Sequence, residues 1–107
     1  MELIGREELK EKLDRGDNLK LAMVLGDWGY RAKHIPGSLN IPAPELAADV
    51  LAPEDEIVVY CSGDPCPASK YAYHILTQRG YKHVRRYAGG IADWEEAGYP
   101  IEGDWRD

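Results

Sequence analysis

Residues 56–76 read EIVVYCSGDPCPASKYAYHIL and contain a strand, a loop and a helix in succession. The run Glu56–Tyr60 is apolar and β-branched after its first residue, which is typical of a strand buried on both faces of a parallel sheet. The helix that follows ends at Gly80, a helix stop. Its inward face is predicted from residues at helical spacing: Ala68, Tyr71, Ala72, Ile75 and Leu76. The loop between them therefore spans residues 62–67, and Cys61 ends the strand directly before it.

The same alternation continues outward from this stretch. Helices are predicted at Arg6–Arg15, at Pro44–Leu51 and around Ile91 and Trp94 before Gly98, and strands at Leu19–Leu25, Leu39–Ile41 and His83–Tyr87. Residues 26–37 are predicted as turn. Strands that alternate with helices require right-handed crossovers, so we expect an α/β, three-layer domain with a mostly parallel central sheet of about four or five strands and helices on both faces.

The composition predicts a single cytoplasmic domain over residues 1–107. A chain of 107 residues suits one core. The amino terminus lacks the apolar block of a signal peptide, and no apolar stretch approaches the roughly 20 residues that span a bilayer. The net charge of -6 opposes attraction to nucleic acid and to anionic lipid. We therefore expect no nucleic-acid partner and no membrane partner.

Two cysteines, Cys61 and Cys66, are too few for a disulfide-stapled secreted domain of this size. Cys61 is placed where a strand ends and a helix begins, and the positive end of the helix dipole favours a thiolate there. We therefore predict that Cys61 is a nucleophile. For Cys66 two interpretations stay open: an incidental loop thiol, or a relay or resolving thiol that forms a disulfide with Cys61 or takes its sulfur.

The loop after Cys61 is predicted to bind the substrate. Its members are Ser62, Gly63, Asp64, Pro65, Pro67, Ala68 and Ser69. Gly63 permits a tight turn, whereas Pro65 and Pro67 each remove a backbone donor. Asp64 adds a negative charge, and no Arg or Lys stands between Cys61 and Ser69 to offset it. Weak use of a small dianion such as thiosulfate is the expected consequence.

Three segments together resemble the rhodanese-like domain family, over roughly residues 18–103. They are HIPGSLNIP at 34–42, VVYC at 58–61 and YAGGIADWEEAGYPIEG at 87–103. The resemblance implies a sulfurtransferase in which the cysteine at position 61 attacks a sulfane sulfur, holds it as a persulfide and yields it to cyanide or a protein thiol. It also implies that the backbone of residues 62–69 wraps the persulfide and that no metal or organic cofactor is needed.

The sequence departs from the usual family pattern at several positions. Met23 and Leu25 stand where the family usually has Asp and Arg, and Gly29 stands where it has Glu. The stretch after Cys61 is also longer than usual by about two residues, and it resembles the variant branch with a second cysteine in an enlarged loop.

The two cysteines also permit functions other than sulfur transfer. One is a non-catalytic interaction module or a thiol redox-sensing module that uses Cys61 and Cys66. A cysteine phosphatase or arsenate reductase is disfavoured, because the loop lacks the arginine that phosphoryl chemistry needs. A zinc site is also disfavoured, because its candidate ligands match no standard spacing. Those ligands are Cys61, Cys66 and two of His34, His74 and His83.

A few further side chains carry expectations of their own. His34 is predicted to be a turn residue, not a base. Four basic residues are predicted to form a solvated face, with Arg86 near enough to the sheet edge to attract an anion: Arg79, Lys82, Arg85 and Arg86. Trp94 is expected in the core by its helical spacing, whereas Trp28 and Trp105 are expected to line or cover a pocket.

Overall fold

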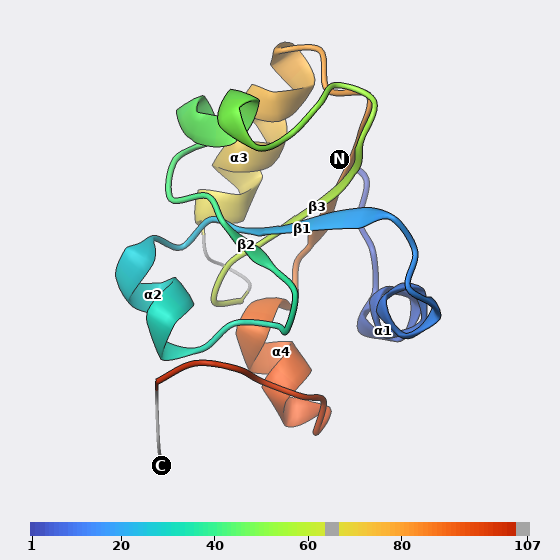
Figure 1. Ribbon diagram of the computed structural model, residues 1–107, viewed down its shortest axis with the longest axis vertical. Helices are drawn as coiled ribbons and strands as arrows, with labels where there is room; N and C mark the ends of the chain where they lie inside the picture. Colours follow the sequence, from blue (N-terminus) through green and yellow to red (C-terminus); the bar gives the residue numbers. More distant parts are fainter. Residues whose placement is uncertain (64–66, 105–107) are drawn as a thin grey trace.

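The computed structural model of the chain describes residues 1–63 and 67–104. Within these residues, four parallel strands form one sheet in the order β2-β1-β3-β4 (Figure 1). The strands are β1 (Leu19–Met23), β2 (Leu39–Asn40), β3 (Glu56–Tyr60) and β4 (His83–Tyr87). The helices are α1 (Arg6–Arg15), α2 (Asp27–Ala32), the 3-10 helix η1 (Pro44–Asp49), α3 (Pro67–Gln78) and α4 (Gly90–Glu96). The predicted α/β class is confirmed.

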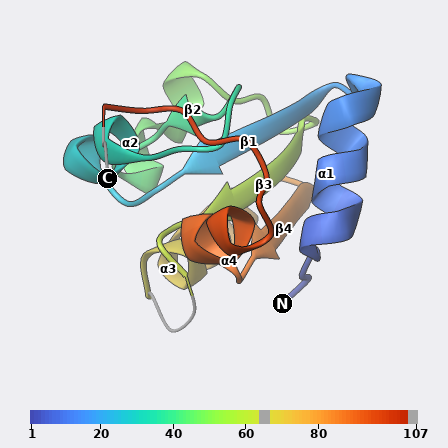
Figure 2. The same ribbon diagram turned by 90° about the horizontal axis from the view of Figure 1, so that it is seen from below.

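The sheet separates two apolar cores. Figure 1 shows α3 and η1 above the strands and α1 and α4 below them, and Figure 2 looks onto the lower face. Successive residues of β3 alternate between the cores: Ile57 and Val59 pack on the α3 side, and Val58 and Tyr60 on the α1 and α4 side. This two-residue alternation produces the three layers that the sequence predicts.

The strand register brings three carboxyl ends to one edge of the sheet. Met23 pairs with Tyr60, and Tyr60 pairs with Tyr87, so β1, β3 and β4 end side by side. In open α/β sheets this edge is where ligands bind. Cys61 directly follows β3 and therefore lies at this edge.

The amino-terminal segment pairs with β4 and covers its outer edge. Leu3 forms a parallel bridge with Arg86, whose N–H donates to the carbonyl of Glu2 at 2.9 Å. The N–H of Ile4 in turn donates to the carbonyl of Arg86 at 3.1 Å. The backbone of Arg86 is thus held by hydrogen bonds to this segment.

The segment predicted as turn contains a helix, α2, which the sequence analysis missed. None of its residues is buried, so it shows no apolar periodicity that would reveal it. The predicted helix at 44–51 is a 3-10 helix, and the strand predicted to reach Leu25 ends at Met23.

Tyr71 of α3 departs from the predicted inward face of this helix. Tyr71 was expected to face inward but is 52% exposed, with its hydroxyl 3.5 Å from Glu45 Oε1 on η1. Tyr71 therefore lies at the border between α3 and η1, not beneath them. No helix among the described residues combines the length and the apolar character that crossing a bilayer demands.

Candidate active site at the carboxyl edge of the sheet

The first amides of α4 hold the backbone that follows β3. Ile91 N–H donates to the carbonyl of Cys61, and Ala92 N–H donates to the carbonyl of Ser62, each at 3.0 Å. The first N–H groups of a helix have no partner within it, so they are available for such bonds. The start of the loop is therefore held by α4, a helix that the sequence predicts but does not connect to Cys61.

The Gly89-Gly90 turn packs directly against the loop. Gly90 has a φ of +65°, and a Cβ built on it would lie 2.5 Å from the Cys61 carbonyl oxygen and 2.6 Å from the Gly63 nitrogen. A Cβ on Gly63 would approach the Gly89 carbonyl oxygen to 3.3 Å. Only glycine meets both the backbone conformation and the close approach at position 90.

Cys61 lies on the α3 side of the sheet and is 1% exposed. Val24 and Ala72 belong to the apolar cluster around it, and its Sγ is 3.8 Å from Ser62 Oγ. Cys61 is disulfide-bonded in this structure. A sulfur in that state is not a nucleophile, because the thiolate is the reactive form. Any chemistry at Cys61 therefore begins with its reduction.

Part of the predicted site lies outside the described residues. These residues are Asp64, Pro65 and Cys66 of the loop, and also Trp105. The other loop positions are described: Ser62 is exposed, Gly63 and Ala68 are half-buried, Pro67 is exposed and Ser69 is buried. The described residues contain no group of three or more His, Cys, Asp or Glu side chains that would hold a metal ion.

Tyr60, next to Cys61, connects β3 to residues 35–38 on the other side of the sheet. Its hydroxyl accepts a hydrogen bond from the Ile35 N–H at 2.9 Å and donates one to Ser38 Oγ at 2.9 Å. Burial raises the pKa of Tyr60 to about 12, so the phenol stays neutral at physiological pH. The motifs at 34–42 and 58–61 therefore meet through one phenol.

His34 belongs to the same turn and is held by local contacts. Its ring stacks on Tyr30 with centroids 3.9 Å apart, and its Nδ1 lies 2.7 Å from the Tyr30 carbonyl oxygen. Its backbone N–H donates to the Glu102 carbonyl at 2.8 Å. These contacts agree with its expected role as a turn residue.

Arg86 is buried, with 3% of its surface exposed, so its assignment to a solvated face was wrong. Its Nε donates to Ser69 Oγ at 2.8 Å, and Ser69 lies in the first turn of α3. Its neighbour Arg85 points to the opposite face and pairs with Glu8 of α1 at 2.7 Å. The two-residue alternation along β4 indicates that Arg86 faces inward, because Val84 is buried on the α3 side and residue 86 lies on the same face.

The departures at Leu25 and Gly29 are sterically coupled. A Cβ on Gly29 would lie 2.2 Å from Leu25 Cδ2, so a longer side chain at 29 collides with the leucine as it is placed here. Met23, at the third departing position, is fully buried in the core on the α1 and α4 side. Apolar groups thus occupy the positions where the resemblance leads one to expect charge.

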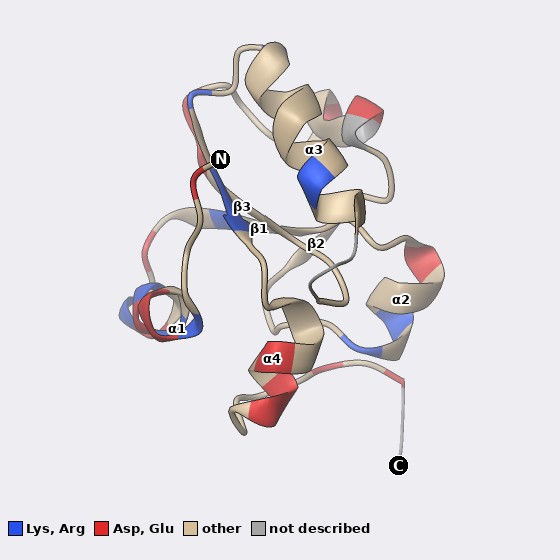
Figure 3. Ribbon diagram, turned by 180° about the vertical axis from the view of Figure 1, so that it is seen from behind, with Lys and Arg blue, Asp and Glu red and all other residues tan. Residues whose placement is uncertain are grey.

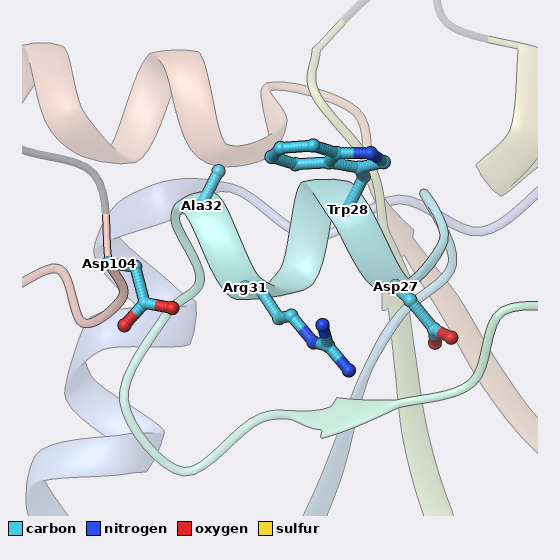
Figure 4. Close-up of a pocket in the computed structure, with 5 residues that line it drawn as sticks. All are labelled: Asp27, Trp28, Arg31, Ala32 and Asp104. Atoms are coloured by element: carbon cyan, nitrogen blue, oxygen red, sulfur yellow. The ribbon is translucent and has the colours of Figure 1, made fainter.

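A pocket of about 390 Å³ lies beside α2 and contains Trp28, as expected of that residue. Its lining residues are Asp27, Trp28, Arg31, Ala32 and Asp104. Figure 4 shows the Trp28 ring and the Arg31 side chain on opposite sides of α2. Trp28 is 87% exposed. Trp94, in contrast, is buried in the core as predicted.

The sequence matches the rhodanese-like domain family over residues 5–97. The chain belongs to this family. The rhodanese-like domain is 36% identical over 101 residues to an HTH-type transcriptional regulator of Mycobacterium tuberculosis, with 92% of this chain and 44% of the regulator covered. It is 31% identical over 93 residues to YrkF, a proposed sulfur carrier protein of Bacillus subtilis, with 85% of this chain and 49% of YrkF covered. It thus spans about half the length of these relatives, or slightly less.

Solved structures show the same fold. The rhodanese-like domain of the Anabaena sp. protein Alr3790 superposes with a TM-score of 0.87 at 28% identity, covering 97% of this chain and 80% of that one. The rhodanese-like fold is thereby established for this chain.

Proposed function

We propose that this rhodanese-like domain is a sulfurtransferase in which reduced Cys61 carries a sulfane sulfur as a persulfide. The main observation in support is that two amides of α4 donate hydrogen bonds to the carbonyls of Cys61 and Ser62 and so fix the backbone there. This hold fixes the cysteine at the edge of the sheet where ligands bind. Membership of the family and the similarity to YrkF support sulfur transfer at the family level.

The proposed reaction has two displacements. The Cys61 thiolate attacks the outer sulfur of the donor, so that a new S–S bond forms at Cys61 and the donor's S–S bond breaks. The electron pair of that bond leaves with the donor remnant, which is sulfite when thiosulfate is the donor. An acceptor thiolate or cyanide then attacks the outer sulfur of the persulfide, and Cys61 leaves as thiolate. No net oxidation occurs, and neither step uses a metal or an organic cofactor.

The sequence of the loop and of the neighbouring strand end favours a donor other than a small dianion. Figure 3 shows acidic residues on α4, the helix that holds the loop: Asp93, Glu95 and Glu96, of which Asp93 pairs with Arg6 and Glu95 with Lys33. The loop adds Asp64, and Met23 and Leu25 supply no positive charge. Like charges disfavour the approach of thiosulfate. We therefore propose a persulfide on a small molecule or a protein thiol as donor, and a thiol as acceptor, with no nucleic acid or membrane involved.

A cytoplasmic location would suit this chemistry. Glutathione and thioredoxin keep cytosolic thiols reduced. The disulfide at Cys61 would then open and release the thiolate that the first displacement requires. The cytoplasmic assignment itself stays a prediction from the sequence.

Mass spectrometry of the intact protein tests the proposal. The protein is reduced, freed of reductant and incubated with a sulfane-sulfur donor such as glutathione persulfide. We expect the wild type to gain the mass of one sulfur atom and to lose it on addition of cyanide, with thiocyanate released. Cys66→Ser should keep this gain and Cys61→Ser should lose it. A gain that persists in Cys61→Ser rejects Cys61 as the carrier.

The second candidate is a thiol redox-sensing module, and two observations favour it. Cys61 is disulfide-bonded and almost fully buried. One of the relatives is a transcriptional regulator of which this domain spans 44%, so the domain also occurs as part of a larger protein. A sensor would cycle between thiol and disulfide at cellular glutathione ratios without gaining sulfur. Redox titration by differential alkylation, run beside the persulfide assay, separates the two functions.

A further inference from the structure

Arg86 is a buried cation at the edge of the sheet that holds the candidate site. Burying a guanidinium is costly, so such groups are retained only where hydrogen bonds or anions compensate them. Its backbone is held on one side by Glu2 and Ile4 and on the other by pairing with Val59 in β3. The guanidinium therefore projects from a fixed point of the sheet.

The sheet register places this cation near Cys61. Arg86 pairs with Val59, and Cys61 follows Val59 by two residues, so both side chains belong to the same face. With a strand spacing of about 4.8 Å and a rise of about 3.3 Å per residue, the two Cα atoms are about 8 Å apart. The arginine side chain is long enough to cover much of that distance.

A hydrogen bond to Ser69 fixes the direction of the Arg86 side chain. Ser69 is 1% exposed and lies in the first turn of α3, immediately after the loop that begins at Cys61. The bond from Arg86 Nε to Ser69 Oγ therefore ties the exit of the loop to β4, while α4 holds its entry. The loop is held at both ends.

We propose that Arg86 is a positioning residue that, anchored by Ser69, supplies the buried positive charge for the ionised Cys61 sulfur. The inference rests on the proposed role of Cys61 as a sulfur anion. It also accounts for an enlarged loop that has no Arg or Lys of its own: the cation comes from the neighbouring strand. Arg86 favours the thiolate and the persulfide anion over their protonated forms, because an opposite charge on the same face of the sheet stabilises the charged species.

The members of the hydrophobic cluster that contains Cys61 carry no positive charge. The members of its cluster from β1, α3 and the neighbouring loops are apolar, except for the phenols of Tyr73 and Tyr81. Phenols carry no charge near neutral pH. The sequence of the loop contains an acidic residue, Asp64, which lies outside the described residues, and it contains no Lys or Arg. Removing Arg86 should therefore have a clear effect.

Alkylation of Cys61 by iodoacetamide tests the proposal in a Cys66→Ser background, where Cys61 is the only thiol. The rate is followed from pH 5 to pH 10 in the reduced protein. We expect Arg86→Met to move the midpoint of the profile upward and to slow the reaction about tenfold at pH 7. Arg86→Lys, which keeps the charge, should restore most of the rate. Ser69→Ala should shift the profile in the same direction by less.

Arg85→Met is the matched control, since it removes an equal charge from the adjacent residue on the opposite face. Its profile should equal that of the parent. The proposal is overturned if Arg86→Met behaves like Arg85→Met, or if Arg86→Lys is as impaired as Arg86→Met. Circular dichroism checks folding. Should Arg86→Met not fold, Ser69→Ala decides, because an unchanged midpoint in that variant also overturns the proposal.

The outcome is separable from that of the proposed function. If the wild type forms the persulfide but Arg86→Met keeps the parental alkylation profile, sulfur transfer is supported and the proposed role of Arg86 is rejected. If the wild type forms no persulfide but Arg86→Met shifts the alkylation profile, the proposed sulfur transfer is rejected and the role of Arg86 stands.

Discussion

At the scale of single residues, Tyr60 shows why a motif on one strand depends on a turn elsewhere. Its hydroxyl is buried and satisfies both the Ile35 N–H and Ser38 Oγ. A buried donor left without a partner costs more than an average hydrogen bond contributes. Tyr60 therefore contributes to stability through its oxygen as well as through its ring.

Tyr60→Phe should lower the free energy of unfolding by about 1–3 kcal/mol, because it leaves the Ile35 N–H without its acceptor. Urea denaturation measures this difference. Tyr71→Phe, at an exposed tyrosine, serves as control and should change stability by less than about 0.5 kcal/mol. Equal stability of the two variants would contradict the assigned role of the hydroxyl.

The same phenol predicts an alkaline limit of stability. Its pKa is raised from 10.0 to about 12 by burial, so the folded state binds this proton more tightly than the unfolded state does. The stability due to this shift is fully present below pH 10 and is lost as the pH rises toward 12. Chemical denaturation at pH 9 to 12 should show that the free energy of unfolding falls more steeply with pH in the wild type than in Tyr60→Phe. Parallel decreases in the two proteins would contradict the assignment to Tyr60.

At the scale of elements, the start of α4 is built around the loop that it holds. Gly90→Ala forces a Cβ against the Cys61 carbonyl oxygen and the Gly63 nitrogen, and it also strains a backbone with φ of +65°. Gly16→Ala is a matched control: its φ is +74° and no atom lies within 4 Å of the added Cβ.

We expect Gly16→Ala to cost about 1–2 kcal/mol, the price of a left-handed conformation alone. Gly90→Ala should cost more than Gly16→Ala, and only Gly90→Ala should change the alkylation rate of reduced Cys61. Thermal denaturation and alkylation kinetics measure the two effects. Similar behaviour of both variants would mean that the turn and the loop are not in close contact.

Helix α1 is tied to β4 by a charged pair that titrates in acid. Hydrogen bonds from Arg85 hold the pKa of Glu8 below its ordinary value of 4.5. A lowered folded-state pKa gives stability that is present above pH 4.5 and is lost as the pH falls below it.

Glu8→Gln should therefore lower stability by about 0.2–1 kcal/mol at pH 7, the range for pairs that are partly exposed to solvent. The difference from wild type should shrink as the pH falls below 4.5, because Glu8 loses its charge as it is protonated. Denaturation curves at pH 7, 5 and 3 measure it. A difference that is independent of pH would assign the effect to packing instead of charge.

At the scale of the whole molecule, one sheet supports two cores that share its strands. Leu9 on α1 and Leu76 on α3 are buried on opposite faces. Because β3 contributes to both cores, neither face can unfold while the other keeps its packing.

Leu9→Ala and Leu76→Ala should each lower stability by about 2–5 kcal/mol and should both keep a single transition. Trp94 fluorescence, in a Trp28→Phe, Trp105→Phe background, reports on the α1 and α4 side, and far-ultraviolet circular dichroism reports on the whole fold. The two probes should shift together in Leu76→Ala. A shift in circular dichroism without one in fluorescence would show that the two faces unfold separately.

Local patterns in the sequence determined the elements and the position of Cys61. The strands at 56–60 and 83–87 and the helix at 6–15 match their predicted bounds, because alternation and helical spacing are properties of consecutive residues. The motifs at 34–42, 58–61 and 87–103 were sufficient for the family, and the order of strands and helices was sufficient for the layers.

Only the tertiary structure decided what surrounds Cys61. The amides of α4 reach the Cys61 and Ser62 carbonyls, Arg86 reaches Ser69, and Tyr71 is left exposed at the border of η1. Each of these features involves residues that are far apart in the chain and that meet only after the crossovers bring their segments together. Periodicity within one segment predicts the face on which a side chain lies. The residue that it contacts there depends on which other segment the fold packs against that face.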